Sequence, residues 1–331
     1  GYDSLSLSGG LYSVGVANIT TDSVREAKKI AVVAAASYAN QTDTSVVVLM
    51  RPAYSYYLYF ANRWPLLLTF QAGDTLTGPI HSNQQIQISN DPVFLAKVTT
   101  DQLTISDQGG AAPKFYGGIE FGTEAIALPS GAALQPLVDT TLATGHVFNQ
   151  ELWLRFNGVG GAYDYSTDGV TFLPDFISNH NGLIMTTGNN HIHVQGTVDG
   201  QVTIISGRDI LVENDLVYAD TSAASDDYTG LVAQHDLRVE YLVGVTNITI
   251  HAAMIVLNKF KVKNNNPGAI LSLNMVGSLV LNIDEGFFSK IGPDAPGDFV
   301  RTLNYDSRLF VNTPPYFPRV MNRIETIYRH D

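Results

Sequence analysis

The chain has 331 residues, only 15% of them charged, and its 19 basic and 31 acidic side chains give a formal net charge of −12. Because the few basic residues are not concentrated anywhere, the composition argues against nucleic acid and anionic membrane surfaces as partners. Cysteine is absent, which excludes disulfides, thiolate nucleophiles and zinc–thiolate sites, and no apolar run approaches the ~20 residues of a membrane-spanning helix.

Residues 1–50 are predicted to form an N-terminal β segment. Strand-like runs at 11–19, 28–39 and 44–50 are joined by polar turns. The middle run, KKIAVVAAASYA, could also be a helix because alanine is the best helix former, but its β-branched neighbours favour a strand. The polar start GYDSLSLSGG is free to pair with another chain, so this segment is a candidate subunit-contact region.

Residues 51–331 are predicted to form a second, larger domain that begins with an aromatic cluster. The rings that we single out are Tyr54, Tyr56, Tyr57, Tyr59 and Trp64. Exposed rings of this kind stack on sugars or dock against a neighbouring subunit. The alternative is that the cluster plugs the first coil of the domain from inside. The sequence leaves both interpretations open.

The stretch 111–182 contains many glycines in turn-like contexts, such as NGVGGAYDYSTDG. It is interpreted as a loop-rich excursion with a short helix near 133–143 and a hairpin strand at 151–156. The tail 285–331 is rich in proline and aromatic residues. Because proline cannot donate a hydrogen bond to a sheet ladder, we expect the tail to lie along the domain or to cap it.

Between residues 183 and 283, β-branched segments follow one another with Gly, Asn and Asp between them. Apolar residues occupy alternate positions in these segments, and a period of two is typical of strands. Segments of four to seven residues that turn every ten or so indicate stacked coils or a sandwich. We interpret the fold as all-β, with a right-handed parallel β-helix, or solenoid, as its main domain.

Six motifs occur in order along the chain: GDTLTGPIHSNQQIQISNDPVFLAKVTT (73–100), FYGGIEFGTEAIALP (115–129), VQGTVDGQVTIISGRDILVENDLVYAD (194–220), GLVAQHDLRV (230–239), ITIHAAMI (248–255) and NYDSRLFVNTPPYFP (304–318). Together they resemble a bacterial domain family of unknown function found in PilX-type, type IV pilus-associated surface proteins. The resemblance implies a pilin-like protein. Such relatives have a leader and a long apolar helix, and neither is visible here. The resemblance therefore implies a helix that was removed, lies outside this sequence, or is supplied by a separate chain.

Four carboxylates gather near one segment: Asp209, Glu213, Asp215 and Asp220. Polysaccharide-cleaving β-helices use carboxylates on neighbouring coils, because glycosidic cleavage needs two such groups at a defined separation. The Asn214-Asp215 pair resembles a turn, however, and a turn would break the alignment of the carboxylates. The preferred interpretation is a solvated face with turn-forming aspartates.

His191 and His193 would lie on one strand face, yet a metal site needs a third ligand. Asp226 and Asp227 lack the spacing of a calcium loop. No Gly-x-Ser-x-Gly elbow or phosphate-binding glycine motif is present. We therefore predict no catalytic residue, no metal, no cofactor and no enzymatic activity.

Two functions of different classes remain. The preferred one is a structural or adhesive subunit of an extracellular bacterial filament, a pilus-like homopolymer or mixed polymer exposed at the cell surface. Its expected partners are copies of itself, other pilin-like subunits, or a separate helical chain. The alternative is a secreted β-helix that binds or cleaves glycans. Calcium and chelator treatment would distinguish them, since only a lyase has an activity to lose.

Overall fold

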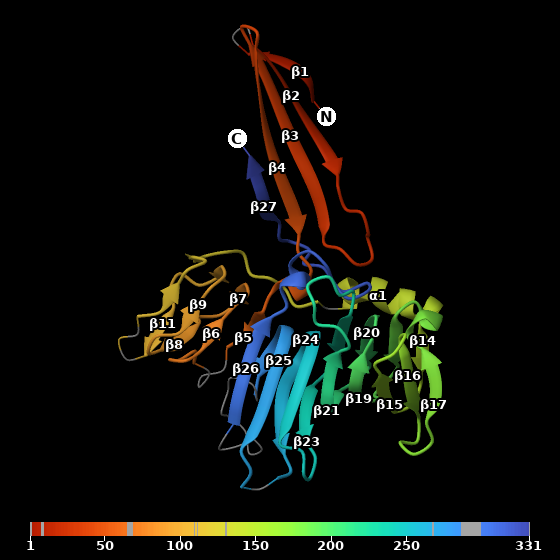
Figure 1. The fold of residues 1–331 in the computed structure, drawn as a ribbon. Helices are drawn as coiled ribbons and strands as arrows, with labels where there is room; N and C mark the ends of the chain where they lie inside the picture. The colour runs from red at the N-terminus through yellow and green to blue at the C-terminus, as the bar shows by residue number, and fades with distance from the viewer. Residues whose placement is uncertain are drawn as a thin grey trace.

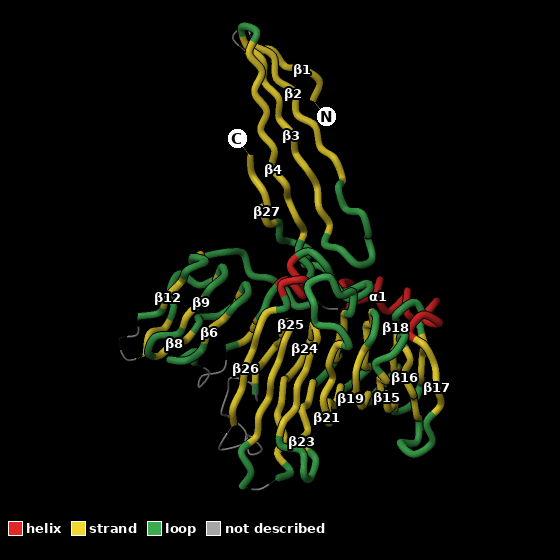
Figure 2. The backbone as a smooth tube through the Cα atoms, viewed as in Figure 1, coloured by secondary structure: helices red, strands yellow, loops and turns green. Residues whose placement is uncertain are grey.

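The computed structural model describes residues 2–7, 10–64, 69–108, 110, 112–129, 131–266, 268–285 and 299–330. They form an elongated body of mostly parallel strands, from which a long, flat ribbon of antiparallel strands projects (Figure 1). Strands predominate throughout the described residues, which confirms the all-β prediction, and the helical elements lie on the side of the body that faces the ribbon (Figure 2). The helical elements are α1 (Gly131–Thr144), η1 (Tyr54–Tyr56), η2 (Ile177–His180) and η3 (Ser307–Phe310). None of the described helices is long and apolar enough to cross a membrane.

The ribbon contains five strands in the order β1-β2-β3-β4-β27, each antiparallel to its neighbour. Its strands are β1 (Tyr2–Leu7), β2 (Gly10–Asn18), β3 (Lys28–Tyr38), β4 (Gln41–Arg51) and β27 (Glu325–His330). The prediction of a strand at 28–39 is confirmed, because pairing on both sides outweighs the helix preference of alanine. Ala39 and Asn40 close the β3–β4 hairpin with φ of 47° and 64°, the positive values that a tight two-residue turn requires.

The C-terminal tail divides between the body and the ribbon. Residues 299–305 form β26 in the body, where it pairs with β25, whereas β27 pairs with β4 and extends the ribbon. The expectation that the whole tail lies along the domain or caps it is therefore wrong for residues 325–330. An uncovered β4 edge would expose a row of unpaired backbone groups, and β27 covers it. The part of the predicted tail at 286–298 lies outside the described residues.

Backbone hydrogen bonds fix the ribbon to the body at its base. The C-terminal segment contacts both the connection between β2 and β3 and the segment that follows β4. The amide of Thr313 donates to the carbonyl of Arg25 at 2.7 Å, and the amide of Tyr54 donates to the carbonyl of Pro318 at 3.0 Å. The ribbon therefore stands on a hydrogen-bonded junction.

The first parallel sheet of the body has the order β13-β10-β7-β5-β25-β24-β22-β20-β18-β14. Its strands are β5 (Tyr59–Arg63), β7 (Ile80–Ser82), β10 (Val98–Thr100), β13 (Ile119–Glu120), β14 (His146–Phe148), β18 (Leu183–Thr186), β20 (Gln201–Ser206), β22 (Tyr228–Ala233), β24 (Asn247–Asn264) and β25 (Leu271–Asp284). The register aligns apolar side chains of successive strands, such as Ile204, Leu231, Met254 and Leu279, and all four are fully buried. The line of inward-facing residues forms the core.

A second parallel sheet has the order β15-β19-β21-β23-β24-β25-β26, and the long strands β24 and β25 take part in both sheets. The strands new to this sheet are β15 (Leu152–Asn157), β19 (Ile192–Val198), β21 (Ile210–Tyr218), β23 (Leu237–Tyr241) and β26 (Phe299–Tyr305). Smaller pairings use β6 (Thr75–Leu76), β8 (Gln87–Ser89), β9 (Val93–Phe94), β11 (Ser106–Gln108) and β12 (Lys114–Phe115). An antiparallel hairpin adds β16 (Ala162–Ser166) and β17 (Leu173–Phe176) beside β15.

The path of the chain through the first sheet explains the stretch 111–182. The chain enters at β5, in the middle of the sheet, and proceeds outward to β13 at one end. It then crosses by way of α1 to β14 at the other end and returns strand by strand to β25 (Figure 1). The predicted helix and the strand at 151–156 are confirmed. Residues 121–129 form a loop as predicted, but the loop-rich interpretation does not hold for β14 and β15, which are full members of the two sheets.

Candidate functional site

The aromatic cluster proposed as a contact surface lies in the core. All five rings are at most 7% exposed: Tyr54, Tyr56, Tyr57, Tyr59 and Trp64. Tyr59 packs edge-on against Phe70 and Trp64, with ring centroids 5.9 and 6.1 Å apart, and its hydroxyl donates to Asp284 at 3.0 Å. Side chains buried to this extent cannot contact a sugar or a neighbouring subunit, so the contact role is wrong and the arrangement agrees with the plugging alternative. Aromatic content alone does not reveal which way the rings point.

The ribbon presents a continuous set of apolar side chains that are not buried. The β2–β3 and β3–β4 registers place one set of apolar side chains on the same face, which we call the ribbon face. It comprises Tyr12, Val14, Val16, Ile30, Val32, Ala34, Ala36, Tyr38, Val47 and Leu49. None of them is buried, and Val16 and Tyr38 are 62% and 67% exposed. Large exposed apolar patches on a folded protein mark interaction sites.

Polar side chains at both ends limit the ribbon face along the strands. Gln41 and Asp43 lie on it near the hairpin, and Lys28 and Arg51 lie on it near the junction with the body. The ribbon projects from the body, and among the residues that the structure describes the body leaves most of the ribbon's length uncovered (Figure 1). The ribbon face is therefore a candidate assembly surface, which the sequence indicated only as a contact region at 1–50.

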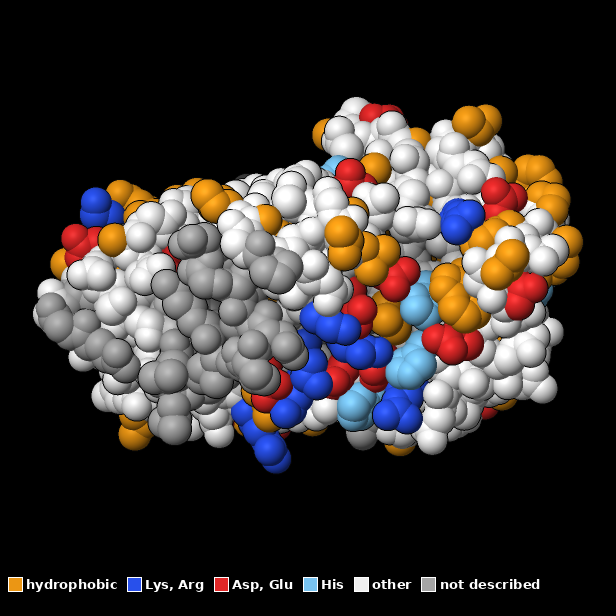
Figure 3. Space-filling model, turned by 90° about the horizontal axis from the view of Figure 1, so that it is seen from below, with side chains coloured by type: hydrophobic (Ala, Val, Ile, Leu, Met, Phe, Trp, Pro, Cys, Tyr) orange, Lys and Arg blue, Asp and Glu red, His pale blue; other side chains and the backbone are white. Residues whose placement is uncertain are grey.

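A row of ion pairs crosses the strands of the second sheet. Asp209, predicted as a catalytic or solvated carboxylate, is only 5% exposed and is held by His235 at 2.8 Å and Arg238 at 3.2 Å. Burial raises the pKa of Asp209, but the His235 hydrogen bond and the Arg238 charge outweigh it and lower the pKa. Asp236 pairs with Lys261 at 2.6 Å. On the side of the body where β23 lies, basic, acidic and histidine side chains gather in one band (Figure 3). Fixed cations neutralise these buried carboxylates.

The other predicted carboxylates have structural roles. Asn214 and Asp215 lie inside β21, so the predicted turn is wrong; a register shift in the β19–β21 pairing accommodates them, and Asp215 accepts from the amide of Thr249 at 2.7 Å. Asp220 accepts from the amide of Ser222, as a turn residue does. Asp227 is buried and accepts from the amides of two loop residues.

His193 and Trp153 form a partly exposed site beside this row. The two rings are stacked, with centroids 4.7 Å apart, and His193 contacts Glu151 at 2.9 Å and Glu213 at 3.1 Å. Burial lowers the pKa of His193, but the two glutamates outweigh it and raise the pKa above its ordinary value. His191 contacts Asp209 instead, at 3.5 Å, so the predicted His-Ile-His pair does not converge on one ligand.

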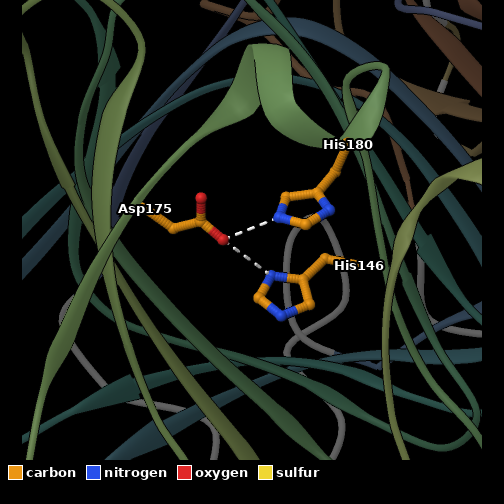
Figure 4. Close-up of side chains that lie close together, drawn as sticks. All are labelled: His146, Asp175 and His180. Atoms are coloured by element: carbon orange, nitrogen blue, oxygen red, sulfur yellow. Dashed lines mark hydrogen bonds and ion pairs between the residues drawn. The ribbon is translucent and has the colours of Figure 1, made fainter.

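The structure also assembles a cluster that the sequence did not predict. His146, Asp175 and His180 come from β14, β17 and η2, and both imidazoles face the same oxygen of Asp175 (Figure 4). Burial raises the pKa of Asp175, but hydrogen bonds from Asn179, the Phe176 amide and His180 outweigh it and lower the pKa to about 2. The sequence offered no more than a carboxylate and a histidine five residues apart, which is a common spacing.

The comparisons with known proteins leave the family open. No family model matches the chain, and no curated protein matches it. Among solved structures, the competence-associated pilin ComZ from Thermus thermophilus is similar over 97% of this chain and 83% of that chain, with a TM-score of 0.42 and 10% identity. A likeness at this level assigns neither a fold nor a function to this chain. The resemblance of the six motifs to PilX-type proteins stays a prediction.

Proposed function

We propose that the protein is a non-enzymatic structural subunit of an extracellular bacterial filament. The single observation that supports this proposal is the ribbon face, an apolar sheet surface that projects from the body and is not covered by it. Assembly would bury this face against a neighbouring subunit and leave the body exposed on the outside of the filament.

The dimensions of the ribbon face fit an apolar helix of another subunit. β3 and β4 each have 11 residues, a length of roughly 35 Å, and three strands span about 10 Å across. An α-helix is about 10 Å in diameter, and about 23 residues of helix are as long as β3. We infer that the partner is a helix supplied by another pilin-like chain or by a segment outside this sequence.

The body is proposed to be a right-handed parallel β-helix, an exposed rod suited to a filament surface. Residues paired in register on successive strands of the first sheet, Ile184, Ile204, Leu231, Met254 and Leu279, lie 20, 27, 23 and 25 residues apart, one coil at a time. Such in-register parallel pairing of consecutive turns of chain is what stacked coils would produce.

Electron microscopy of the protein from its native source tests the filament proposal. Filaments with this chain in every repeat are expected, and mass analysis of the N-terminal peptide from the same sample would identify any attached helix. Isolated monomers without periodic assembly would refute the proposal.

Substitutions on the ribbon test the assembly surface separately. Val16→Asp with Val32→Asp places two charges on the ribbon face, and we expect it to abolish incorporation into filaments. Val243→Asp is the matched control, since Val243 is 86% exposed on the body. Deletion of residues 1–10 removes the edge strand β1 and is expected to reduce polymerisation while the fold stays intact. Normal assembly by the ribbon-face variant would assign assembly to another surface.

A second candidate, glycan binding, is favoured by one observation. Trp153, a half-buried ring, stacks on His193 beside Glu151 and Glu213, and an aromatic ring next to carboxylates can pack against a sugar. A screen of acidic and neutral polysaccharides with wild type and Trp153→Ala tests it. Binding that Trp153→Ala abolishes would favour this function, and cleavage sensitive to chelators would make the protein an enzyme.

A further inference from the structure

Three metal-ligating side chains converge at the end of the body where α1 joins β14. One ligand atom each from His146, Asp175 and His180 lies within 4.8 Å of the other two. The Nε2 atom of His180 is 2.6 Å, and the Nδ1 atom of His146 is 3.2 Å, from Oδ2 of Asp175 (Figure 4). Two imidazoles and one carboxylate oxygen therefore point into one small space.

The spacing of these atoms is close to that of a metal centre. Zinc binds histidine nitrogen and carboxylate oxygen at about 2.0–2.1 Å, so tetrahedral ligand atoms lie about 3.3 Å apart. The two distances to Asp175, 2.6 and 3.2 Å, differ from this value by less than 1 Å. Small side-chain rotations would therefore accommodate an ion without backbone movement.

The carboxylate is already oriented for such a role. Its other oxygen, Oδ1, accepts from the amide of Phe176 and from the side chain of Asn179, both at 2.7 Å. Outer hydrogen bonds of this kind fix a ligating carboxylate. The second oxygen, Oδ2, faces the two histidines and accepts one further, long hydrogen bond of 3.3 Å from the Tyr163 hydroxyl. The backbone of η2 is fixed as well, because the Ile177 amide donates to Gly161 at 2.9 Å.

A second cluster of histidine and aspartate side chains shows how an ion-pair network differs from a possible metal site. Asp209, His235 and Asp236 also converge, but Arg238 and Lys261 already neutralise the two carboxylates. In the part of the chain that the structure describes, the ion pairs of Asp175 are with the two histidines alone. Their rings are stacked with centroids 4.0 Å apart, a geometry in which two imidazolium charges would repel each other.

We propose that His146, Asp175 and His180 bind a divalent transition metal ion, with zinc as the ion that this ligand set fits best. The three side chains are 19%, 14% and 23% exposed, so an ion can enter from solvent and keep water as a further ligand. The hydroxyl of Tyr163 lies 2.8 Å from Nδ1 of His146 and borders the site. A bound ion would clamp the β16–β17 hairpin and η2 to β14. This site is independent of the filament proposal.

Zinc titration of the full chain by calorimetry, with the visible absorption of Co²⁺ as a second readout of coordination, tests the site. We expect one ion per chain and a rise in Tm on zinc addition. His180→Gln removes a ligand and should weaken zinc binding at least about 100-fold, whereas Asn179→Ala, which removes only an outer hydrogen bond, should weaken it about 10-fold or more. His235→Gln in the neutralised cluster should bind zinc as the wild type does.

Circular dichroism and Tm without metal establish that each variant folds, and Asn179→Ala provides the test if His180→Gln does not. Absence of zinc binding by the folded wild type would overturn the proposal. So would unchanged binding in both Asn179→Ala and folded His180→Gln, or loss of binding in His235→Gln.

Discussion

His81 offers the sharpest test of how the core is built. It lies in β7 and is fully buried, with Nδ1 2.8 Å from the Thr99 hydroxyl and Nε2 2.8 Å from Oδ1 of Asn83. The Ile126 amide donates to that oxygen and the Asn83 amide donates to the Ile126 carbonyl, which fixes Oδ1 as an acceptor. Nε2–H therefore donates to Asn83, and Nδ1 accepts from Thr99. The neutral ring is satisfied at both nitrogens.

Burial lowers the pKa of His81 from 6.5 to about 4, and the Arg323 charge acts in the same direction, against the hydrogen bond to Asn83. Below pH 6.5 the unfolded chain binds a proton that the folded chain excludes until about pH 4. The stabilisation is therefore complete above pH 6.5 and is lost as the pH falls toward 4. The shift corresponds to about 3 kcal/mol at 1.36 kcal/mol per pKa unit.

Equilibrium urea unfolding of wild type and His81→Gln between pH 8 and pH 4 measures this contribution. The glutamine amide keeps a donor toward Asn83 and an acceptor toward Thr99 but does not titrate. We expect the wild type to lose about 3 kcal/mol more than the variant between pH 6.5 and pH 4. Parallel pH profiles of wild type and His81→Gln would refute the reasoning.

Three further predictions concern the sheets. Gly277→Ala should lower the free energy of unfolding by more than about 2 kcal/mol, because φ of Gly277 is +144° and a Cβ would collide with the carbonyl of Ala252. Gly15→Ala, where a Cβ would meet open space, should leave the free energy of unfolding almost unchanged, and equal losses for the two variants on urea unfolding would contradict this. Leu273→Ala, at a fully buried position, should cost about 2–5 kcal/mol, and a loss below 1 kcal/mol would mean that the core collapses around the gap. Deletion of residues 325–331 should expose the β4 edge and increase self-association in analytical ultracentrifugation; a strictly monomeric variant would show that this edge is not adhesive.

The sequence predicts those parts of the fold in which a local repeat of apolar residues determines the secondary structure. Between residues 183 and 283, apolar side chains alternate because each strand has one face in the core, and the structure places Ile204, Leu231 and Met254 there. The helix near 133–143 was also recognisable from composition. These strands and this helix depend on residues that are close in the sequence, so the local pattern of apolar residues is enough to predict them.

Arrangement over long distances could not be predicted in the same way. Leu279 pairs with Tyr59, and β27 pairs with β4, across more than two hundred residues, and nothing local marks either pairing. The cluster around Asp175 depends on the β16–β17 hairpin, whose glycine-rich sequence favours a loop. The position of Tyr59 and its neighbours stayed open between core and surface, because a run of aromatic residues has the same composition in both places.

The ends of the parallel sheets explain why association would fall on the ribbon. At the outer edge of the second sheet lies β17, where Pro174 removes a backbone donor, and at one end of the first sheet β13 has two residues and an ion pair between Glu120 and Lys97. Short strands, proline and charge are the features that keep sheet edges from pairing with other chains. The ribbon has the opposite character, with strands of up to 11 residues and exposed valines such as Val16. Two protected edges of the body together with a bare ribbon face form the surface distribution that the proposed assembly through the ribbon requires.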